Sequence, residues 1–128
     1  MAVEIVALSD ELRALDRYNE DEVSISIHRL DSRVFAAAIA QADNHGDRWW
    51  VSRVLVRNPD KRGQGLGSIA LQRMLAVIAG LSRLPVYVAP GGYEDNTEQQ
   101  FRFYLKNGFQ RIENDSKNLV WNPPGPIA

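Results

Sequence analysis

The feature that most constrains the fold is a glycine-rich loop at residues 62–68, placed directly between a predicted strand and a predicted helix. Residues 48–57 fit a strand, whereas the apolar residues of 68–79 recur with the period of a helix that Gly80 would end. Another apolar strand follows at residues 84–89. Strand, helix and strand in this order form a βαβ unit, so the strands near residues 54 and 87 should be parallel.

The residues before the loop predict an antiparallel meander. Residues 3–8 fit a short strand, and Ser9 is placed to cap a brief amphipathic helix. Residues 23–28 are apolar at every second position, which is the period of a half-buried strand. Polar turns at 31–32 and 43–47 then bound strands at 33–41 and 48–57, and short turns of this kind favour antiparallel neighbours.

The residues after the βαβ unit predict a helix and a hairpin. Asp95, Asn96 and Thr97 offer caps for a helix that runs to residue 107 and stops at Gly108, and residues 109–113 and 117–121 can pair as a hairpin. The predicted fold class is therefore α/β, with a mixed sheet of the α+β kind. Residues 1–122 are expected to form a single domain, and the Pro-rich residues 123–128 a flexible tail.

Charge and composition exclude several classes of protein. The chain of 128 residues has a net charge of −1, which does not fit a strongly basic nucleic-acid-binding domain. No apolar run approaches the ~20 residues of a membrane span, and the amino terminus lacks a secretion signal, so no membrane contact and a cytoplasmic location are expected. The chain has no cysteine, which removes a thiolate metal site and a thiol nucleophile.

Resolved along the chain, the charge becomes more informative. Residues 61–93 contain 4 basic and no acidic side chains, and this segment includes the glycine-rich loop. A stretch without carboxylates is either buried or faces an anionic ligand. Glycines allow backbone N–H groups to approach a ligand, and a helix start favours negative charge, so a pyrophosphate suits this loop.

Spacing separates the nucleotide-binding alternatives for the loop. A dinucleotide fingerprint would need a glycine in place of Ser68 and an acidic residue about 20 positions on. After the loop, the first acidic residue is Glu94, and no Gly-Lys-Ser/Thr tripeptide of a Walker loop is present. A plain glycine-rich loop and a binder of some other phosphorylated ligand remain open.

The loop does match the pattern Arg/Gln-x-x-Gly-x-Gly/Ala, through Arg62, Gly65 and Gly67. Downstream, residues 101–109 (Phe-Arg-Phe-Tyr-Leu-Lys-Asn-Gly-Phe) match Tyr-x-x-x-Gly-Phe. In both motifs and in their order the chain resembles the GNAT N-acetyltransferase superfamily. The resemblance implies a GNAT-like fold with splayed parallel strands, acetyl-CoA as co-substrate and no metal.

By that resemblance, the backbone of the loop would hold the phosphates, with Lys61 or Arg73 meeting the remaining charge, and the pantetheine arm would pair with the strand at 55–56. The Val56 amide would point at the thioester oxygen, and Asn96 could bond the pantetheine amides or serve only as a helix cap. The residues implied in acetyl-CoA binding are Leu55, Val56, Arg62, Gly63, Gln64, Gly65, Leu66, Gly67, Ser68, Asn96 and Tyr104.

Two residues are candidates for proton transfer. Tyr104 matches the family's general acid, and a phenol with an ordinary pKa near 10 is close enough to a thiol near 8.5 for the transfer. Many relatives place a carboxylate on the strand ahead of the loop, but residues 49–53 contain none. His28 could serve as the base directly, and Glu94, Asp95 or Glu98 through water. A base is unnecessary if the acceptor amine has a low pKa.

The sequence therefore predicts an N-acetyltransferase that moves an acetyl group directly from acetyl-CoA to an amine of a protein or a small molecule. The alternative is a non-catalytic CoA-binding or protein-interaction module on the same fold. Trp49 and Trp50 point to opposite faces of one strand, so one should lie in the core and the other could line the acceptor site. The short connection before residue 23 implies an open acceptor site, which favours a peptide or protein amine. The resemblance also implies that a homodimer can form, although no residue pattern identifies an interface.

Overall fold

The structure is a computed structural model that describes residues 2–29, 34–56, 65–91 and 97–124. Within these residues one mixed sheet has the order β1-β2-β3-β4-β5-β6-β8-β7 and is accompanied by two helices. The elements are β1 (Ala2–Ala7), β2 (Leu12–Tyr18), β3 (Glu22–Arg29), β4 (Val34–Ala42), β5 (Trp49–Val56), α1 (Leu66–Leu81), β6 (Val86–Val88), α2 (Thr97–Lys106), β7 (Gln110–Ile112) and β8 (Asp115–Trp121). The predicted fold class, a mixed α/β sheet, is confirmed.

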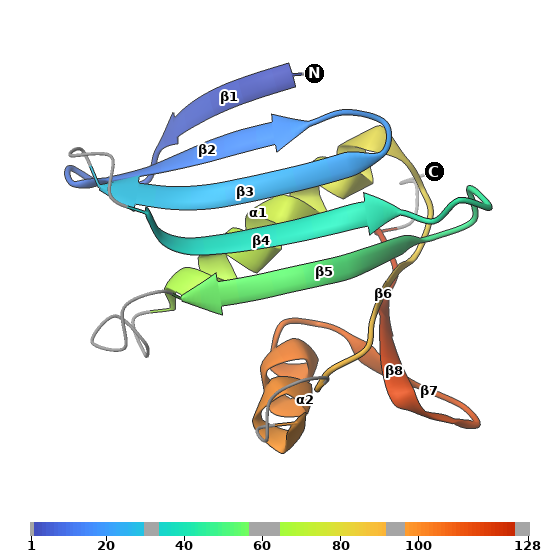
Figure 1. The fold of residues 1–128 in the computed structure, drawn as a ribbon. Helices are drawn as coiled ribbons and strands as arrows, with labels where there is room; N and C mark the ends of the chain where they lie inside the picture. Colours follow the sequence, from blue (N-terminus) through green and yellow to red (C-terminus); the bar gives the residue numbers. More distant parts are fainter. Residues whose placement is uncertain (1, 30–33, 57–64, 92–96, 125–128) are drawn as a thin grey trace.

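The first five strands form an antiparallel meander, in which β3, β4 and β5 are the three predicted meander strands, and α1 covers one of its faces (Figure 1). Buried residues alternate along β3 and β4, so that Ile25, Ile27 and Ala38 face the helix. From α1 they meet the buried side chains of Leu71 and Met74. This layer between sheet and helix is the core of the meander.

The short helix predicted to start at Ser9 is wrong, because the chain forms strand β2 there. The Ser9 hydroxyl accepts hydrogen bonds from the N–H groups of Glu11 (3.3 Å) and Leu12 (3.1 Å), so it closes a turn between β1 and β2. The sequence of β2 lacks the apolar alternation of a strand, because one of the positions that face α1 holds a charged residue. Asp16 is 1% exposed on the same face as Ala14, and it breaks the alternation of apolar residues.

The parallel strands of the βαβ unit are splayed, as the resemblance implied. Trp49 and Trp50 of β5 pair with Val86 and Tyr87 of β6, and no further pair joins the two strands, although β5 continues to Val56. Figure 1 shows β6 leaving β5 steeply after this contact. The outer edge of β5 is therefore left without a strand partner along its second half, within the described residues.

The predicted helix of the βαβ unit is present as α1 and differs from the prediction at both ends. This helix begins at Leu66, two residues before the predicted start, and runs through Gly80 to Leu81, so Gly80 does not end it. Helix α2 ends at Lys106, one residue before the predicted end, and Gly108 follows with a φ of 97° that lets the Phe109 N–H reach back to the Tyr104 carbonyl at 3.1 Å. The predicted hairpin is present as β7 and β8, and β8 lies between β6 and β7.

Candidate active site

The start of α1 offers backbone N–H donors for which the N-cap residue supplies no side-chain acceptor. Gly65 is the N-cap, with φ 75° and ψ 12°, a left-handed conformation that suits glycine. Gly65 has no side chain to cap this end of the helix, and no acidic residue occupies the first turn. The first N–H groups of a helix have no acceptor within it, and the helix dipole favours an anion there. The motif positions Gly65, Leu66, Gly67 and Ser68 therefore form an end that fits a phosphate group.

The free edge of β5 directs a second donor toward the β6 side. The Ala42 N–H of β4 donates to the Asp21 carbonyl at 2.8 Å, so it points away from β5. Donor directions alternate along a strand, so Ala36 also points away from β5. Its ladder partner on β5 is Val56, and ladder partners point both inward or both outward. The Val56 N–H is thus directed away from β4, to the side where β6 has separated, which is the direction that the predicted thioester donor requires.

A β-bulge in β5 determines this direction and was not predicted. Ile39 pairs with Arg53 and Ala40 with Val51, so Ser52 is an extra residue on β5. An extra residue reverses the direction of every later donor and side chain on its strand. The sequence carries no signal for it, because Ser52 and Arg53 are ordinary polar residues for an exposed strand.

Tyr104 lies at the end of α2 among aromatic rings. Its ring is 5.3 Å from that of Phe109 and 5.2 Å from that of Phe103, and the residue is 6% exposed. Burial raises the pKa of Tyr104 to about 12, in contrast to the ordinary phenol expected from the sequence. Among the described residues no fully buried side-chain oxygen lacks a partner, and the Tyr104 hydroxyl has no hydrogen bond to any of them, so this hydroxyl reaches the surface.

Close contacts join α2 to the start of α1. A Cβ placed on Gly67 would lie 3.4 Å from Val56 Cγ2 and 3.7 Å from the Phe103 ring, so this glycine sits between β5 and α2. The Asn107 side chain donates to the Ser68 hydroxyl at 3.2 Å. The predicted phosphate end, the predicted thioester strand and the helix that carries Tyr104 are therefore neighbours. Asn107 was not predicted as part of the site, because before Gly108 it was interpreted as a helix end.

The other predicted site residues fall into two groups. Arg62, Gly63, Gln64 and Asn96 lie outside the described residues, as do Lys61, Glu94 and Asp95. His28 lies on β3, with Nε2 2.6 Å from the Ser26 hydroxyl, and strand β4 separates it from β5. Strands are about 4.8 Å apart, so His28 is two strand spacings, about 10 Å, from β5. The role of His28 stays a prediction, and at that distance it would need water.

Arg73 does not face the phosphate end of α1, so its predicted contact with phosphate is wrong. It forms a two-pronged ion pair with Asp16, with Nε 3.2 Å from Oδ1 and Nη2 bonded to Oδ2. Asp16 is buried on β2, and a buried carboxylate needs such a partner. The guanidinium is thus committed to joining β2 to α1.

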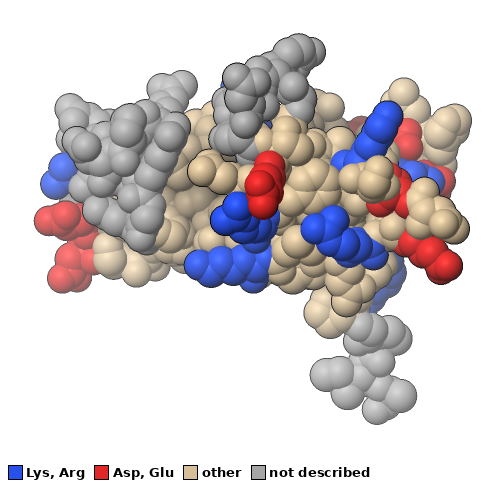
Figure 2. Space-filling view, turned by 90° about the horizontal axis from the view of Figure 1, so that it is seen from below, with Lys and Arg blue, Asp and Glu red and all other residues tan. Residues whose placement is uncertain are grey.

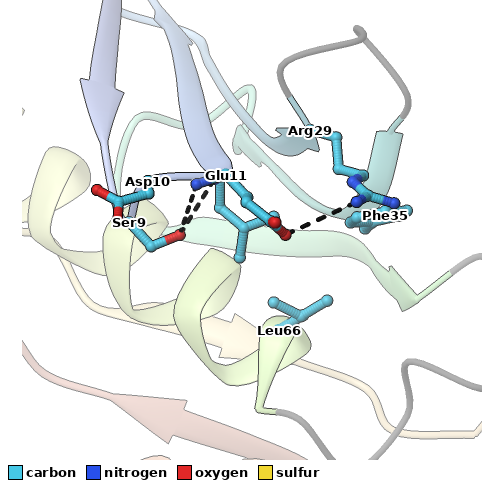
Figure 3. A pocket seen from close by; sticks show the side chains of 7 residues that line it. Ser9, Asp10, Glu11, Arg29, Phe35 and Leu66 are labelled. Carbon is cyan, nitrogen blue, oxygen red and sulfur yellow. Dashed lines mark hydrogen bonds and ion pairs between the residues drawn. The ribbon is translucent and has the colours of Figure 1, made fainter.

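A hollow of about 380 Å³ lies between the β1–β2 turn and Leu66, the first residue of α1 (Figure 3). The β1–β2 turn lines one side, and Phe35 and Leu66 form an apolar wall. Glu11 and Arg29 form a loose ion pair of 3.7 Å across it, and the Arg29 guanidinium lies 5.9 Å from the Phe35 ring centre. Because Glu11 and Arg29 neutralise each other, this hollow has no unpaired charge from them that would indicate the chemistry of a ligand.

Basic side chains gather near α2. Figure 2 shows the molecule from below, with Lys and Arg at the centre of this face and acidic side chains more numerous toward its ends. Helix α2 contributes Arg102 and Lys106, and Arg102 pairs with Glu98 at 3.1 Å.

Over the described ranges no three acidic or histidine side chains form a group that could hold a metal ion. Neither described helix is long and apolar enough to cross a membrane.

Solved structures share this fold. An acetyltransferase of the GNAT family from Staphylococcus aureus matches with a TM-score of 0.65 and 15% identity, over 80% of this chain and 68% of that chain. The GNAT family N-acetyltransferase YhbS from Escherichia coli, in complex with CoA, matches with a TM-score of 0.62 and 15% identity, over 80% of this chain and 59% of that chain. The anti-CRISPR protein AcrVA5 matches with a TM-score of 0.59 and 20% identity, over 79% of this chain and 98% of that chain.

These likenesses, together with the splayed strands, show that the chain has the GNAT fold. At such low identity they show the fold and not the reaction. No protein-family model and no curated protein matches the sequence.

Proposed function

We propose that the protein is a GNAT N-acetyltransferase that transfers an acetyl group from acetyl-CoA directly to an amine. The observation that carries the proposal is the convergence of three features: an uncapped helix start behind Gly65, an outward N–H at Val56 on a splayed strand, and the neighbouring Tyr104. The fold of a CoA-bound acetyltransferase supports the choice of donor.

Acetyl-CoA supplies the activated acyl group, and the protein's residues orient it and move one proton. The N–H groups at the start of α1, together with the predicted contacts of Arg62, Gly63 and Gln64, hold the pyrophosphate, and Leu55 and Val56 pair with the pantetheine arm. The Val56 N–H polarises the thioester carbonyl; one such donor contributes about 3 kcal/mol in comparable sites. The neutral amine forms the new C–N bond and gives up one proton to water or to a base. The C–S bond breaks, the departing thiolate takes the hydroxyl proton of Tyr104, and the resulting phenolate regains a proton from water.

The raised pKa of Tyr104 limits how strong an acid it is. Proton transfer from a phenol with a pKa of about 12 to a thiolate whose acid is near 8.5 is uphill by about 3.5 units, or about 5 kcal/mol. Turnover at 1 to 1,000 per second corresponds to a barrier of roughly 13–17 kcal/mol, so this cost is compatible with catalysis. Tyr104 is fully protonated at neutral pH and always carries the proton to be donated.

Two described side chains are candidates for the base that deprotonates the amine. His28 is a candidate only through water, because β4 lies between it and β5. Glu98 is exposed on α2 and already pairs with Arg102. An acceptor amine with a low pKa would need neither.

Two measurements test the proposal. Thermal unfolding should shift upward with CoA and acetyl-CoA but not with nucleotides; stabilisation by nucleotides alone would contradict it. Thiol release over a panel of amines should then show turnover, and Tyr104→Phe should lower kcat on the order of 100-fold while CoA still stabilises the variant. Unchanged kcat in Tyr104→Phe would remove Tyr104 from the acid role.

A non-catalytic CoA-binding or protein-interaction module is the second candidate, because residues 49–53 of β5 contain no carboxylate. Its signature would be stabilisation by CoA with no thiol release from any amine of the panel. The same two measurements therefore separate the candidates.

A further inference from the structure

The face of the meander opposite α1 is covered by no element among the described residues. Figure 1 shows α1 behind strands β2–β5 and no helix in front of them. Side chains on this face are half-buried or exposed, and at its β1 end Val3 and Ile5 are 57% and 71% exposed. We call this surface the open face. It exists because residues 9–22 form turns and a strand rather than a covering helix.

Strand register aligns one row of side chains straight across the open face. This central row consists of Ile5, Leu15, Ser26, Ala37 and Leu55. Its middle members, Ser26 and Ala37, have small side chains, so they project less from the sheet than Leu15 and Leu55 on either side. It ends at Leu55, in the segment of β5 proposed to lie beside the thioester. At about 4.8 Å between strands the row is about 19 Å long, which about six extended residues would span.

Positive charge borders the central row. The neighbouring row contains Arg17 and Arg53, both exposed, and neither forms an ion pair with a described residue. On the other side lies Arg13, whose guanidinium bonds only carbonyl oxygens, at 2.7 and 2.9 Å, and so keeps its charge uncompensated. Within the open-face positions of β2–β5 that the structure describes, the one carboxylate is Glu22, at the far end of β3. The border is therefore complementary to an acidic partner.

We propose that the open face is the docking surface for the acceptor, and that this acceptor is an acidic polypeptide segment lying across strands β1–β5. Its carboxylates meet Arg17, Arg53 and Arg13, and its apolar side chains cover Ile5 and Val3. The amine to be acetylated lies at the Leu55 end, beside the edge of β5. Trp50, which faces this side and packs against Tyr87 at 5.5 Å, borders the same surface.

Two other occupants fit the observations less well. A nucleic acid would need a denser basic surface than a few arginines on a chain of net charge −1, and it would gain nothing from Ile5 and Val3. A second copy of the chain docked face to face would bring arginines of the two copies together, which costs energy. An acidic, partly apolar polypeptide satisfies both the charges and the exposed side chains.

This inference rests on the proposed acetyl transfer for the identity of the acceptor, but its test does not require turnover. The probe is a fluorescent peptide of about 12 residues, roughly twice the number that spans the central row. In it, one lysine is flanked by Glu, Ala and Leu. Its counterparts carry Gln or Arg in place of Glu, and a single-stranded DNA of similar length is a further probe. Binding is measured by fluorescence anisotropy with the intact protein at low and high salt.

The protein variants are Arg17→Glu combined with Arg53→Glu, and Arg83→Glu as the matched control. Arg83 is exposed between α1 and β6 and bonds the Pro124 carbonyl, away from the open face, so it controls for one of the two charge reversals, each of which is also made singly. Stabilisation by CoA is recorded for every variant, which shows that each one folds and tests the cofactor proposal separately.

We expect the Glu peptide to bind about tenfold more tightly than the Arg peptide, with the Gln peptide in between. The double variant should weaken Glu-peptide binding by about tenfold, and Arg83→Glu should change it by less than about twofold. High salt should weaken the binding of the Glu peptide. Equal binding of the Glu and Arg peptides, an equal loss in both variants, or preferential binding of DNA would overturn the inference. So would a wild-type dimer in sedimentation that the double variant converts to monomer, because a second copy would then cover the face.

Discussion

The two faces of the meander are built from alternate residues of the same strands, yet they differ in almost every physical property. On the covered face, Ile25, Ala38 and their neighbours are buried against Leu71 and Met74, and the buried charge among the described residues, Asp16, is paired. On the open face, arginines that form no ion pair with a described residue border small and apolar side chains. Helix α1 thus determines which of the two alternating sets of side chains becomes the core, and it leaves the other set exposed for binding.

The largest expected effect comes from breaking the ion pair on the covered face. Arg73→Met leaves the Asp16 carboxylate, 1% exposed, without its partner, and should lower the free energy of unfolding by about 3–5 kcal/mol. Asp16→Asn should cost less, because Arg73 is partly exposed and can turn to water. The double variant Asp16→Leu with Arg73→Met should recover much of the loss. Chemical denaturation measures all three, and an Arg73→Met variant as stable as wild type would show that the carboxylate is solvated after all.

A leucine on each face gives the matched comparison of packing. Leu71→Ala opens space in the layer between α1 and the sheet and should cost about 3 kcal/mol. Leu15→Ala, on the half-buried open face, should cost about 1 kcal/mol. Urea denaturation with unchanged slopes checks both values. Equal losses would mean that some other part of the protein covers the open face.

Tyr104 extends the comparison to a titrating group in the C-terminal part of the core. Its pKa in the folded protein, about 12, lies above the ordinary value of 10.0, because burial disfavours the charged phenolate. The stability that this provides is fully present below pH 10 and is lost as the pH rises from 10 toward 12. The loss specific to Tyr104 should be about 2–3 kcal/mol. Tyr104→Phe should remove that part of the pH dependence in unfolding measured from neutral to alkaline pH; identical profiles of variant and wild type would contradict it.

The smallest effect is expected at the exposed end of the open face. Ile5→Thr, at a side chain that is 71% exposed, should change the free energy of unfolding by less than about 0.5 kcal/mol. Threonine keeps the β-branched shape, so the strand itself is not penalised. Thermal and chemical unfolding check this value. A loss above 1 kcal/mol would show that Ile5 is buried in the protein in solution, for instance between two copies.

Much of the fold was predictable because local patterns agreed with it. Alternation along residues 23–28 and the glycine at 108 each correspond to the element that formed. The exception, β2, failed for a physical reason: Asp16 occupies a core position, and a charge there is tolerated only because Arg73 comes from a helix 57 residues away. No local pattern could show that partner.

The candidate site was predictable in part. The motif around Gly65 and Gly67 indicated the helix start, and the segment ending at Phe109 indicated Tyr104. The contact of Gly67 with Phe103 and the hydrogen bond from Asn107 to Ser68 join these two segments, and both depend on how α1 and α2 pack. The direction of the Val56 N–H depends on the extra residue Ser52 of the β-bulge.

By itself, the sequence determined the order of the elements and the glycine-rich start of α1, because periodicity and backbone freedom act over a few neighbouring residues. Only the tertiary structure decided that β5 and β6 separate beyond Trp50, that Arg73 serves Asp16 rather than a phosphate, and that the open face stays uncovered. These features arise from contacts between residues far apart in the chain. The free energy of such a contact depends on which polar, charged and apolar groups are removed from water together.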